Sequence, residues 1–281
     1  MRIGIYKAFK PICFTNSVTD YAGWSREIIN LICIFAERDH KVYILSETDI
    51  DKNQAMHLPS NIFIGDIHEK YDRIFVFSSN MTEDEITKIK LLRLNTPQLD
   101  YIWTDYPSTP HSIEIYDNIY TQSPTMYTYG ALETLICYKY KKSKLLDKSI
   151  NYYFGGSERN RLDKFIEYVW RPDCVFHGKS SFFGINNRIS FYDNECNMKK
   201  AKFSPVFLEK ECVNDGWLTQ RYYECLINDV IPLTDIEYDN YANLISKTDV
   251  RRVNNYKEVI EKMKLFENKT VYNKMIQKQR S

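Results

Sequence analysis

The stretch from residue 71 to residue 105 decides the fold class, and it reads YDRIFVFSSNMTEDEITKIKLLRLNTPQLDYIWTD. It begins with the apolar run Tyr71–Phe77 and continues with a helical pattern over Glu83–Leu94, which Thr82 can cap. A second apolar run, Leu99–Trp103, ends it. A strand, a helix and another strand of these lengths form the unit from which parallel sheets are built. The stretch therefore predicts an α/β fold with helices on both faces of a parallel sheet.

The same alternation extends to both sides of this stretch. Before it, we expect strands at Arg2–Tyr6 and Lys41–Leu45 on either side of a helix at Trp24–Arg38. After it, the basic segment YKYKKSKLLDK at residues 138–148 is the best candidate for a domain boundary. A second series of strands and helices is expected at Ile150–Phe154, Glu158–Trp170, Val175–Phe176, Pro205–Leu208, Leu218–Asn228, Val230–Thr234, Tyr256–Phe266 and Thr270–Gln279. The sequence thus predicts two Rossmann-like domains that face each other, residues 1–145 and 146–281.

Composition excludes several classes of protein. The chain has 281 residues, of which 43% are hydrophobic, so it can bury a real core and is not expected to be disordered. No apolar run reaches the ~18–20 residues that span a bilayer, and no signal-peptide pattern opens the chain. The seven cysteines form no CxxC pair and the five histidines show no metal-ligand spacing, so we expect reduced thiols and no zinc site. These features predict a cytoplasmic protein.

The segment Gly155-Gly156-Ser157 is the first candidate site. It lies between an expected strand and an expected helix, in a chain with only nine glycines. Glycines there let backbone N–H groups approach an anion at a helix N-terminus. Arg159 and Arg161 follow, where acidic residues are usual, and an arginine fork suits a phosphate. We favour a diphosphate site over the alternative, a tight turn followed by two surface arginines.

Two further groups of polar residues could carry chemistry. Thr219, Arg221 and Glu224 lie on one expected helix, where a carboxylate can hold ribose hydroxyls, although an ordinary ion pair three residues apart is the simpler explanation. Asp105 follows a strand and Glu27 lies early in the first helix, and a carboxylate beside a cleft can serve as a general base. Either acid considered alone is more often simply solvated.

The ordered set of segments resembles a known family, the DNA β-glucosyltransferases of T-even bacteriophages. The resemblance rests on Ser25–Phe35 with Glu27, YDRIFVFSSN at 71–80, YIWTDYPSTP at 101–110, YYFGGSERNR at 152–161 and DGWLTQRYYECLINDVIPLTDIEYD at 215–239. It implies a GT-B fold, in which two Rossmann-like domains face a central cleft. It also implies an enzyme that moves glucose from UDP-glucose onto 5-hydroxymethylcytosine in duplex DNA.

The resemblance assigns roles to the candidate residues. Asp105 corresponds to the family's general base and Glu27 to a second acid of the active site. Gly156 and Ser157 match the diphosphate-binding turn. Arg159, Arg161 and Arg221 match arginines that hold the diphosphate, and Glu224 matches the glutamate that grips the ribose. With these we group Thr219 as a donor-binding residue, on its place in the same helix.

The expected function is that of an inverting, UDP-glucose-dependent DNA glucosyltransferase in the cytoplasm of an infected bacterium, which protects phage DNA from host restriction. Loops expected to face DNA are shorter than in the family, which favours glucosyl-5-hydroxymethylcytosine as acceptor over bare 5-hydroxymethylcytosine. A divalent cation such as Mg²⁺ or Mn²⁺ could assist product release, but Asp49-Ile50-Asp51 is too short a match to identify a ligand set. No tightly bound cofactor and no membrane partner are expected. The residues expected to bind DNA phosphates are Lys88, Lys90, Arg93, Lys139, Lys141, Lys142 and Lys144.

Two alternative functions remain open at the level of sequence. One is a GT-B transferase that acts on a small sugar or lipid acceptor. The other is a non-catalytic protein that binds DNA or a nucleotide.

Overall fold

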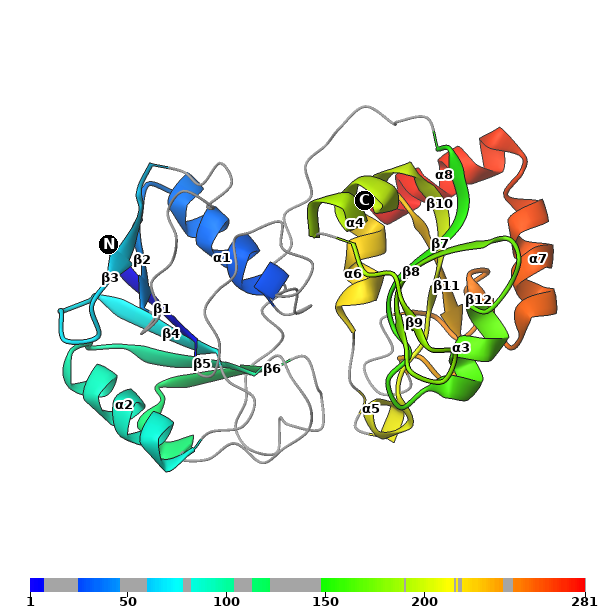
Figure 1. Cartoon of the computed structure of the whole chain (residues 1–281). Coiled ribbons are helices and arrows are strands. Elements are labelled where there is room, and N and C mark those ends of the chain that lie inside the picture. Colours follow the sequence, from blue (N-terminus) through cyan, green and yellow to red (C-terminus); the bar gives the residue numbers. More distant parts are fainter. Residues whose placement is uncertain are drawn as a thin grey trace. The chain divides into compact units, whose positions relative to one another are not determined.

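The computed structural model describes residues 1–7, 25–45, 60–77, 82–103, 113–121, 148–189, 191–214, 216, 219–239 and 245–280. The chain divides into two compact units, Met1–Lys139 and Tyr140–Ser281, each with its own sheet (Figure 1).

The described part of the N-terminal unit holds a six-stranded parallel sheet in the order β3-β2-β1-β4-β5-β6. Its elements are β1 (Arg2–Lys7), α1 (Ser25–Glu37), β2 (Lys41–Leu45), β3 (Ile62–Gly65), β4 (Arg73–Phe77), α2 (Glu83–Leu94), β5 (Leu99–Trp103), a 3-10 turn (Ile113–Ile115) and β6 (Asn118–Thr121). Helix α1 leads from β1 toward one edge of the sheet and α2 leads from β4 toward the other. Because such crossovers are right-handed, the two helices cover opposite faces (Figure 1). This strand order is that of a Rossmann fold.

The stretch that predicted the fold class forms the expected elements. Helix α2 begins and ends where the helical pattern indicated, and its N-cap Thr82 makes a capping box with Glu85. Helix α1 buries Ile28, Leu31 and Ile32 against the apolar strands of the sheet. This apolar face of α1 therefore helps to build the core of the N-terminal unit.

The described part of the C-terminal unit holds a second six-stranded sheet, in the order β12-β11-β10-β7-β8-β9. Its elements are β7 (Ile150–Ser157), α3 (Leu162–Tyr168), β8 (Cys174–Ser180), β9 (Ile185–Asn186), α4 (Phe191–Lys200), β10 (Ala201–Val206), α5 (Lys210–Asn214), α6 (Gln220–Ile227), β11 (Ile231–Asp235), β12 (Arg252–Val253), α7 (Tyr256–Leu265) and α8 (Lys269–Arg280). Read from β9, this is again the Rossmann order, except that β9 runs antiparallel to β8. The two Rossmann-like halves predicted from the sequence are confirmed.

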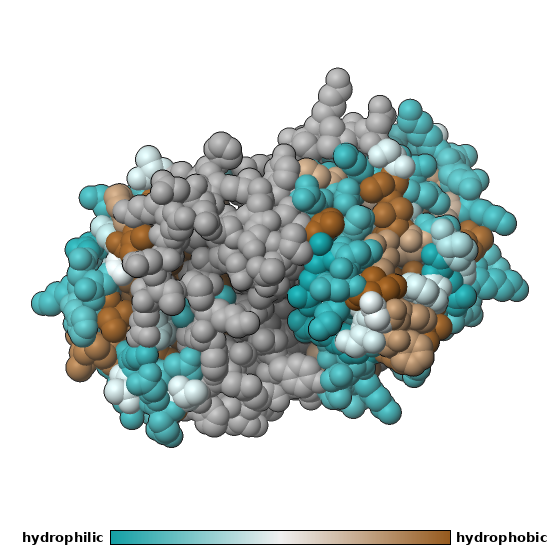
Figure 2. Space-filling model, in the orientation of Figure 1, coloured by the Kyte–Doolittle hydropathy of each residue, from teal (hydrophilic) through white to brown (hydrophobic). Residues whose placement is uncertain are grey.

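Aromatic side chains form much of the core of this unit. Phe154, Phe165 and Phe207 pack together, with Phe154 stacked on Phe207 at a centroid distance of 5.5 Å. Large apolar side chains also remain on the surface, including Trp170 and Phe182, and brown areas interrupt the hydrophilic face of the C-terminal unit in Figure 2.

The prediction of a turn at Gly155-Gly156-Ser157, with a helix over Glu158–Trp170, is wrong. These three residues are the last of β7, and α3 begins only at Leu162. They continue the strand because β8 is longer than expected and pairs with β7 as far as Ser157. The glycines allow close packing: a Cβ on Gly178 would lie 1.5 Å from the Gly156 carbonyl oxygen, and one on Gly155 would lie 1.9 Å from Oδ1 of Asn194.

Several short elements were not predicted. They are β3, β6, β9, β12, α4 and α5. Strand β3 has two exposed residues out of four, and α4 has the polar sequence FYDNECNMKK, so neither carries a clear apolar period. In the C-terminal sheet the strand expected at Pro205–Leu208 lies earlier, at Ala201–Val206. Within the described ranges no helix is long and apolar enough to cross a membrane.

Candidate functional site

The two middle strands of the C-terminal sheet, β7 and β10, pair with each other in their amino-terminal halves. Ala201 of β10 pairs with Ile150 of β7, and Phe203 pairs with Tyr152. Beyond these pairs β7 continues along β8 to Ser157, and β10 continues along β11. The crossovers that leave β7 and β10 run in opposite directions, so this is the switch point of the sheet. Open α/β sheets bind ligands at such a point.

The guanidinium of Arg161 joins the two strands at the switch point. Arg161 is the N-cap of α3, and it donates to the carbonyl oxygen of Ser157 at 2.9 Å and to that of Phe207 at 3.1 Å. It also lies over the Phe207 ring, 4.8 Å from the centroid. Burial lowers the pKa of Arg161 to about 10; Glu209 opposes this, and repulsion from the guanidinium groups of Arg159 and Arg221 adds to it. Among the described residues, Nε of Arg161 has no hydrogen-bond partner.

A second arginine reaches the same place from α6. Arg221 donates to the carbonyl oxygen of Gly155, and its Nη1 lies 2.7 Å from Oε2 of Glu224. The Arg221 side chain is 16% exposed and that of Glu224 is 3% exposed, so the ion pair is largely desolvated. Nη2 of Arg221 lies 3.5 Å from the position that a Cβ on Gly156 would take. Arg221 and Glu224 thus form the ion pair that their spacing allows, and the pair lies at the switch point; the ribose contact expected of Glu224 stays a prediction.

The remaining predicted donor residues lie around these two arginines. Arg159 has a left-handed backbone (φ 47°), which costs energy for a residue other than glycine. Its exposed side chain lies 3.7 Å from the buried carboxylate of Glu209. Thr219 is the N-cap of α6, but its hydroxyl makes no cap hydrogen bond and has no partner among the described residues.

This arrangement favours an anion. Arg159, Arg161 and Arg221 converge on the carboxyl end of β7, while the carboxylates of Glu209 and Glu224 are the two that pair with them in the described residues. A bound anion would offset the burial, and the added repulsion between arginines, that lower the pKa of Arg161. The assignment of this anion to a nucleotide diphosphate remains a prediction.

The acids and most lysines of the predicted site fall outside the part of the chain that the structure describes. They are Asp105, Lys139, Lys141, Lys142, Lys144 and the segment 49–51; Glu27 lies in α1, but its side chain is not described. Their proposed roles remain predictions.

The three basic residues of α2 lie in the described part, and two of them have acidic partners. Nζ of Lys88 is 2.8 Å from Asp84, and Arg93 makes two hydrogen bonds to the carboxylate of Asp117. Asp117 also accepts a hydrogen bond from the backbone N–H of Leu99 at 2.7 Å. Arg93 thus already supports the sheet, and the DNA contact expected of it, as of Lys88 and Lys90, stays a prediction.

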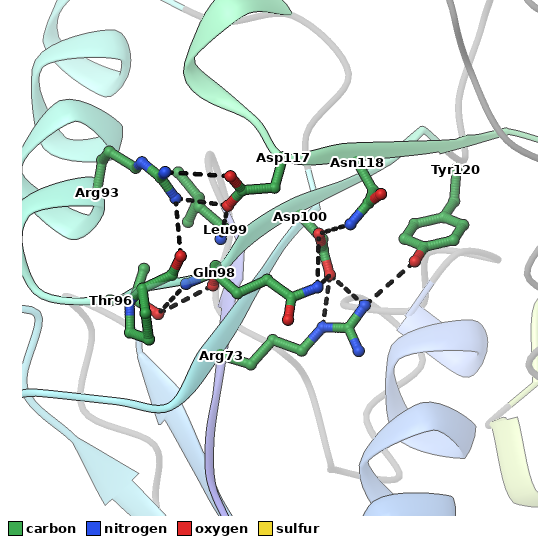
Figure 3. A network of polar contacts seen from close by, with 10 residues as sticks. Arg73, Arg93, Thr96, Gln98, Leu99, Asp100, Asp117, Asn118 and Tyr120 are labelled. Carbon is green, nitrogen blue, oxygen red and sulfur yellow. Dashed lines mark hydrogen bonds and ion pairs between the residues drawn. The ribbon is translucent and has the colours of Figure 1, made fainter.

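Figure 3 shows that the contacts of Arg93 belong to a polar network at the amino ends of β4, β5 and β6. Asp100 is fully buried, pairs with Arg73 and accepts a hydrogen bond from Nδ2 of Asn118 at 2.7 Å. Arg73 also donates to the Tyr120 hydroxyl at 3.1 Å. The network ties three neighbouring strands together at the edge opposite to the one that binds ligands in Rossmann folds.

Sequence reasoning missed two residues of the switch point. Glu209 follows β10 and pairs with Arg159, and Arg188 follows β9 with its Nη2 3.5 Å from Oγ of Ser157. Neither belongs to a recognisable motif, and β9 itself was not predicted. Among the described residues no three His, Cys, Asp or Glu side chains gather into a group that could hold a metal ion.

Two Rossmann-like sheets in one chain, the second with a cationic switch point, give this protein the GT-B glycosyltransferase fold. No family model matches the chain. Among characterised proteins, the DNA beta-glucosyltransferase of Enterobacteria phage T4 is 27% identical over 131 residues. This alignment covers 46% of the chain and 34% of the phage protein, so it spans about a third of that relative's length.

Solved structures of DNA glucosyltransferases match nearly the whole chain. A crystal structure of the DNA-modifying enzyme beta-glucosyltransferase superposes with a TM-score of 0.63 at 17% identity, covering 99% of this chain and 93% of that one. An alpha-glucosyltransferase in complex with UDP and a 13-mer DNA superposes with a TM-score of 0.54 at 13% identity, covering 99% and 94%. At these identities the superpositions establish the fold. Together with the phage T4 protein, they show that the chain resembles the phage DNA glucosyltransferases.

Proposed function

We propose that this protein is a DNA glycosyltransferase that transfers glucose from UDP-glucose to a modified cytosine in duplex DNA. The observation that carries the proposal is the arginine bridge at the switch point of the C-terminal sheet, where Arg161 links Ser157 and Phe207 beside the Arg221–Glu224 pair. Residues 146–281 would bind the donor and residues 1–145 would face the acceptor. The resemblance to phage DNA glucosyltransferases supports UDP-glucose as the donor and DNA as the acceptor.

In the proposed reaction, the acceptor hydroxyl attacks C1 of glucose in line with the departing UDP, which inverts the anomeric centre. Asp105 takes the proton from the hydroxyl. The positive charges of Arg159, Arg161 and Arg221 stabilise the negative charge that develops on the diphosphate. Glu224, on the same face of α6 as Arg221, would accept hydrogen bonds from the ribose hydroxyls. No step is assigned to a divalent cation.

If the acceptor is 5-hydroxymethylcytosine it must leave the base stack, since a hydroxyl on a stacked base cannot reach a buried sugar carbon. Binding would then depend mainly on DNA phosphates, held by lysines such as Lys90 and the 139–144 group, and would weaken steeply with salt. We favour glucosyl-5-hydroxymethylcytosine as the acceptor. The product would carry a disaccharide, and such a bulky base would shield phage DNA from host restriction.

The proposal is tested by mass spectrometry of nucleosides after duplex DNA has been incubated with the protein and UDP-glucose. Two duplexes are compared, one with 5-hydroxymethylcytosine and one with its glucosylated form. A gain of one hexose on either base supports the transferase. Equal or faster transfer to the bare base contradicts the acceptor preference alone, whereas no gain on either base contradicts the DNA acceptor.

The Asp105→Ala variant tests the base. We expect it to bind UDP normally and to lose transfer by ~10²–10⁴-fold, the usual contribution of a general base. If it keeps more than about a tenth of the rate, Asp105 is not the base, and Glu27 becomes the candidate.

Release of glucose from UDP-glucose into water separates the alternative functions. Hydrolysis without transfer to DNA would favour a GT-B enzyme for a small sugar or lipid acceptor. UDP binding with neither hydrolysis nor transfer would favour a non-catalytic binding protein.

A further inference from the structure

The β8–β9 hairpin brings an additional arginine to the switch point. Nη2 of Arg188 lies 3.5 Å from Oγ of Ser157, the last residue of β7. The carbonyl oxygen of the same serine accepts a hydrogen bond from Arg161 at 2.9 Å. Two guanidinium groups therefore approach Ser157, that of Arg161 at its carbonyl oxygen and that of Arg188, from the hairpin, at its hydroxyl.

The hairpin holds Arg188 in place through its neighbour Asn187. The backbone N–H of Asn187 donates to the Gly178 carbonyl oxygen at 2.9 Å, and its Oδ1 accepts from the Gly178 N–H at 2.7 Å. Its Nδ2 donates to the Phe176 carbonyl oxygen at 2.8 Å. Three hydrogen bonds from one residue to β8 fix the backbone immediately before Arg188.

A second anchor holds the turn of the same hairpin. The buried carboxylate of Glu158, which directly follows Ser157, accepts hydrogen bonds from the Ser180 hydroxyl and from the backbone N–H of Phe182. Because Glu158 is used in this way, it is not directed at the arginines. The turn and the end of β7 thus form one connected structure.

Arg188 also differs from the other charged groups near it. It is exposed, and within the described ranges it makes no ion pair with a carboxylate and lies instead beside the Ser157 hydroxyl. Arg159 and Arg221, in contrast, lie near Glu209 and Glu224. An exposed guanidinium that is held in position without a carboxylate can bind a phosphate at little cost in desolvation.

We infer that Arg188 is a further donor-binding residue, which contacts the diphosphate of the nucleotide sugar from the hairpin side of Ser157. Its proximity to Ser157 and Arg161 favours the donor over a DNA phosphate. The inference rests on the proposed function, because it takes the anion at the switch point to be a nucleoside diphosphate. Asn187 acts as a positioning residue for Arg188.

Calorimetric titrations with UDP and with uridine test the inference. We expect Arg188→Ala to weaken UDP binding about tenfold, the lower end of the effect of losing a charge-assisted hydrogen bond, and to leave uridine binding unchanged. Arg188→Lys should recover part of the loss. Lys200→Ala is the matched control: it removes one exposed positive charge from the same unit, just before the amino end of β10, and should leave UDP affinity unchanged.

The positioning role has its own readout. Asn187→Ala should weaken UDP binding while the chain keeps its thermal stability within a few degrees, and the double variant should lose no more affinity than Arg188→Ala alone. If Arg188→Ala binds UDP as tightly as the unsubstituted chain, the inference is wrong and the proposed function still stands. The same holds if the variant loses affinity for DNA alone. Absence of UDP binding to the unsubstituted chain overturns both.

Discussion

Arginines at opposite edges of the two sheets have different partners. At the amino-end edge of the N-terminal sheet, Arg73 pairs with the buried Asp100, and Arg93 pairs with Asp117 (Figure 3). At the carboxyl-end edge of the C-terminal sheet, Arg161 donates to two backbone carbonyl oxygens, and its pKa is lowered by burial and further by repulsion from neighbouring arginines. The first edge is balanced in charge, and the second has an excess of positive charge.

The difference separates a structural network from a site for a ligand. An arginine that is fully paired with a carboxylate has little left to offer an anion, and removing its partner leaves a poorly solvated charge. Carbonyl oxygens orient a guanidinium without cancelling its charge. Arg161, which donates to two carbonyl oxygens, is therefore held in position and still able to attract a diphosphate, whereas Arg221 also has the carboxylate of Glu224 as a partner.

The largest effect is expected at the structural edge, from Asp100→Ala. This change leaves Arg73 without its carboxylate and removes the acceptor of Asn118. Breaking a buried pair costs about 3–5 kcal/mol, and we expect the lower end because the Arg73 side chain is 26% exposed. Urea denaturation followed by circular dichroism measures the loss for the N-terminal unit.

Asp84→Ala is the matched control for Asp100→Ala. Its ion pair with Lys88 is exposed, and such pairs contribute less than about 0.5 kcal/mol. Equal stability of the two variants would show that the Asp100 network is not structural. UDP affinity of folded Asp100→Ala should equal that of the unsubstituted chain.

The next effect is expected at the switch point and concerns binding rather than folding. Arg161→Ala and Glu224→Ala should each weaken UDP binding tenfold to a hundredfold, since a charge-assisted hydrogen bond contributes ~1.5–3 kcal/mol. Calorimetric titration measures this. Arg171→Ala, which removes an arginine paired with Glu167 in the same unit, should bind UDP normally. Unchanged affinity in both site variants would remove the donor-site assignment.

The sequence predicted much of the fold because its signals were local. The capping box at Thr82 and the apolar runs of β4 and β5 each identify an element without reference to the rest of the chain. The short edge strands β3, β9 and β12 carry no such signal, because their formation depends on a neighbouring strand that is already in place.

The sequence indicated several residues that the structure brings together at the switch point, but it did not predict their geometry. Gly155 and Gly156 were expected to form a turn that binds an anion, but they continue a strand that ends at the switch point. The contact of Arg161 with the Phe207 carbonyl oxygen joins residues 46 positions apart, and no local pattern encodes it. Arg188 was missed because its position depends on a hairpin stabilised by Asn187.

The smallest expected effect concerns two lysines of the C-terminal unit, which extend the comparison between carbonyl and carboxylate partners. Lys148 donates to the carbonyl oxygens of Lys199 and Asn228, at 2.8 and 2.9 Å, and burial lowers its pKa to about 8 although Asp229 opposes the shift. Burial also acts to lower the pKa of Lys164, but hydrogen bonds to Asp235 and Glu237 raise it overall. The pKa of the lysine held by carbonyl oxygens is thus lowered, and the pKa of the lysine held by carboxylates is raised.

The shift of Lys148 predicts a dependence of stability on pH. Between about pH 8 and the usual lysine pKa of 10.5 the unfolded chain holds a proton on Lys148 that the folded chain has lost, so the free energy of unfolding should rise with pH. The slope cannot exceed about 1.4 kcal/mol per pH unit, the value for one proton. Urea denaturation at pH 8, 9 and 10 of the unsubstituted chain and of Lys148→Met isolates this contribution as the difference between the two. The free energy of unfolding of the unsubstituted chain should exceed that of Lys148→Met by an amount that grows with pH. The corresponding difference from Lys164→Met should not grow, because the folded chain keeps the proton on Lys164. If the free energy of unfolding varies with pH in the same way for the unsubstituted chain and Lys148→Met, the pKa of Lys148 is not lowered in the folded chain. The contrast between arginines held by carbonyl oxygens and those held by carboxylates would then not extend to lysine.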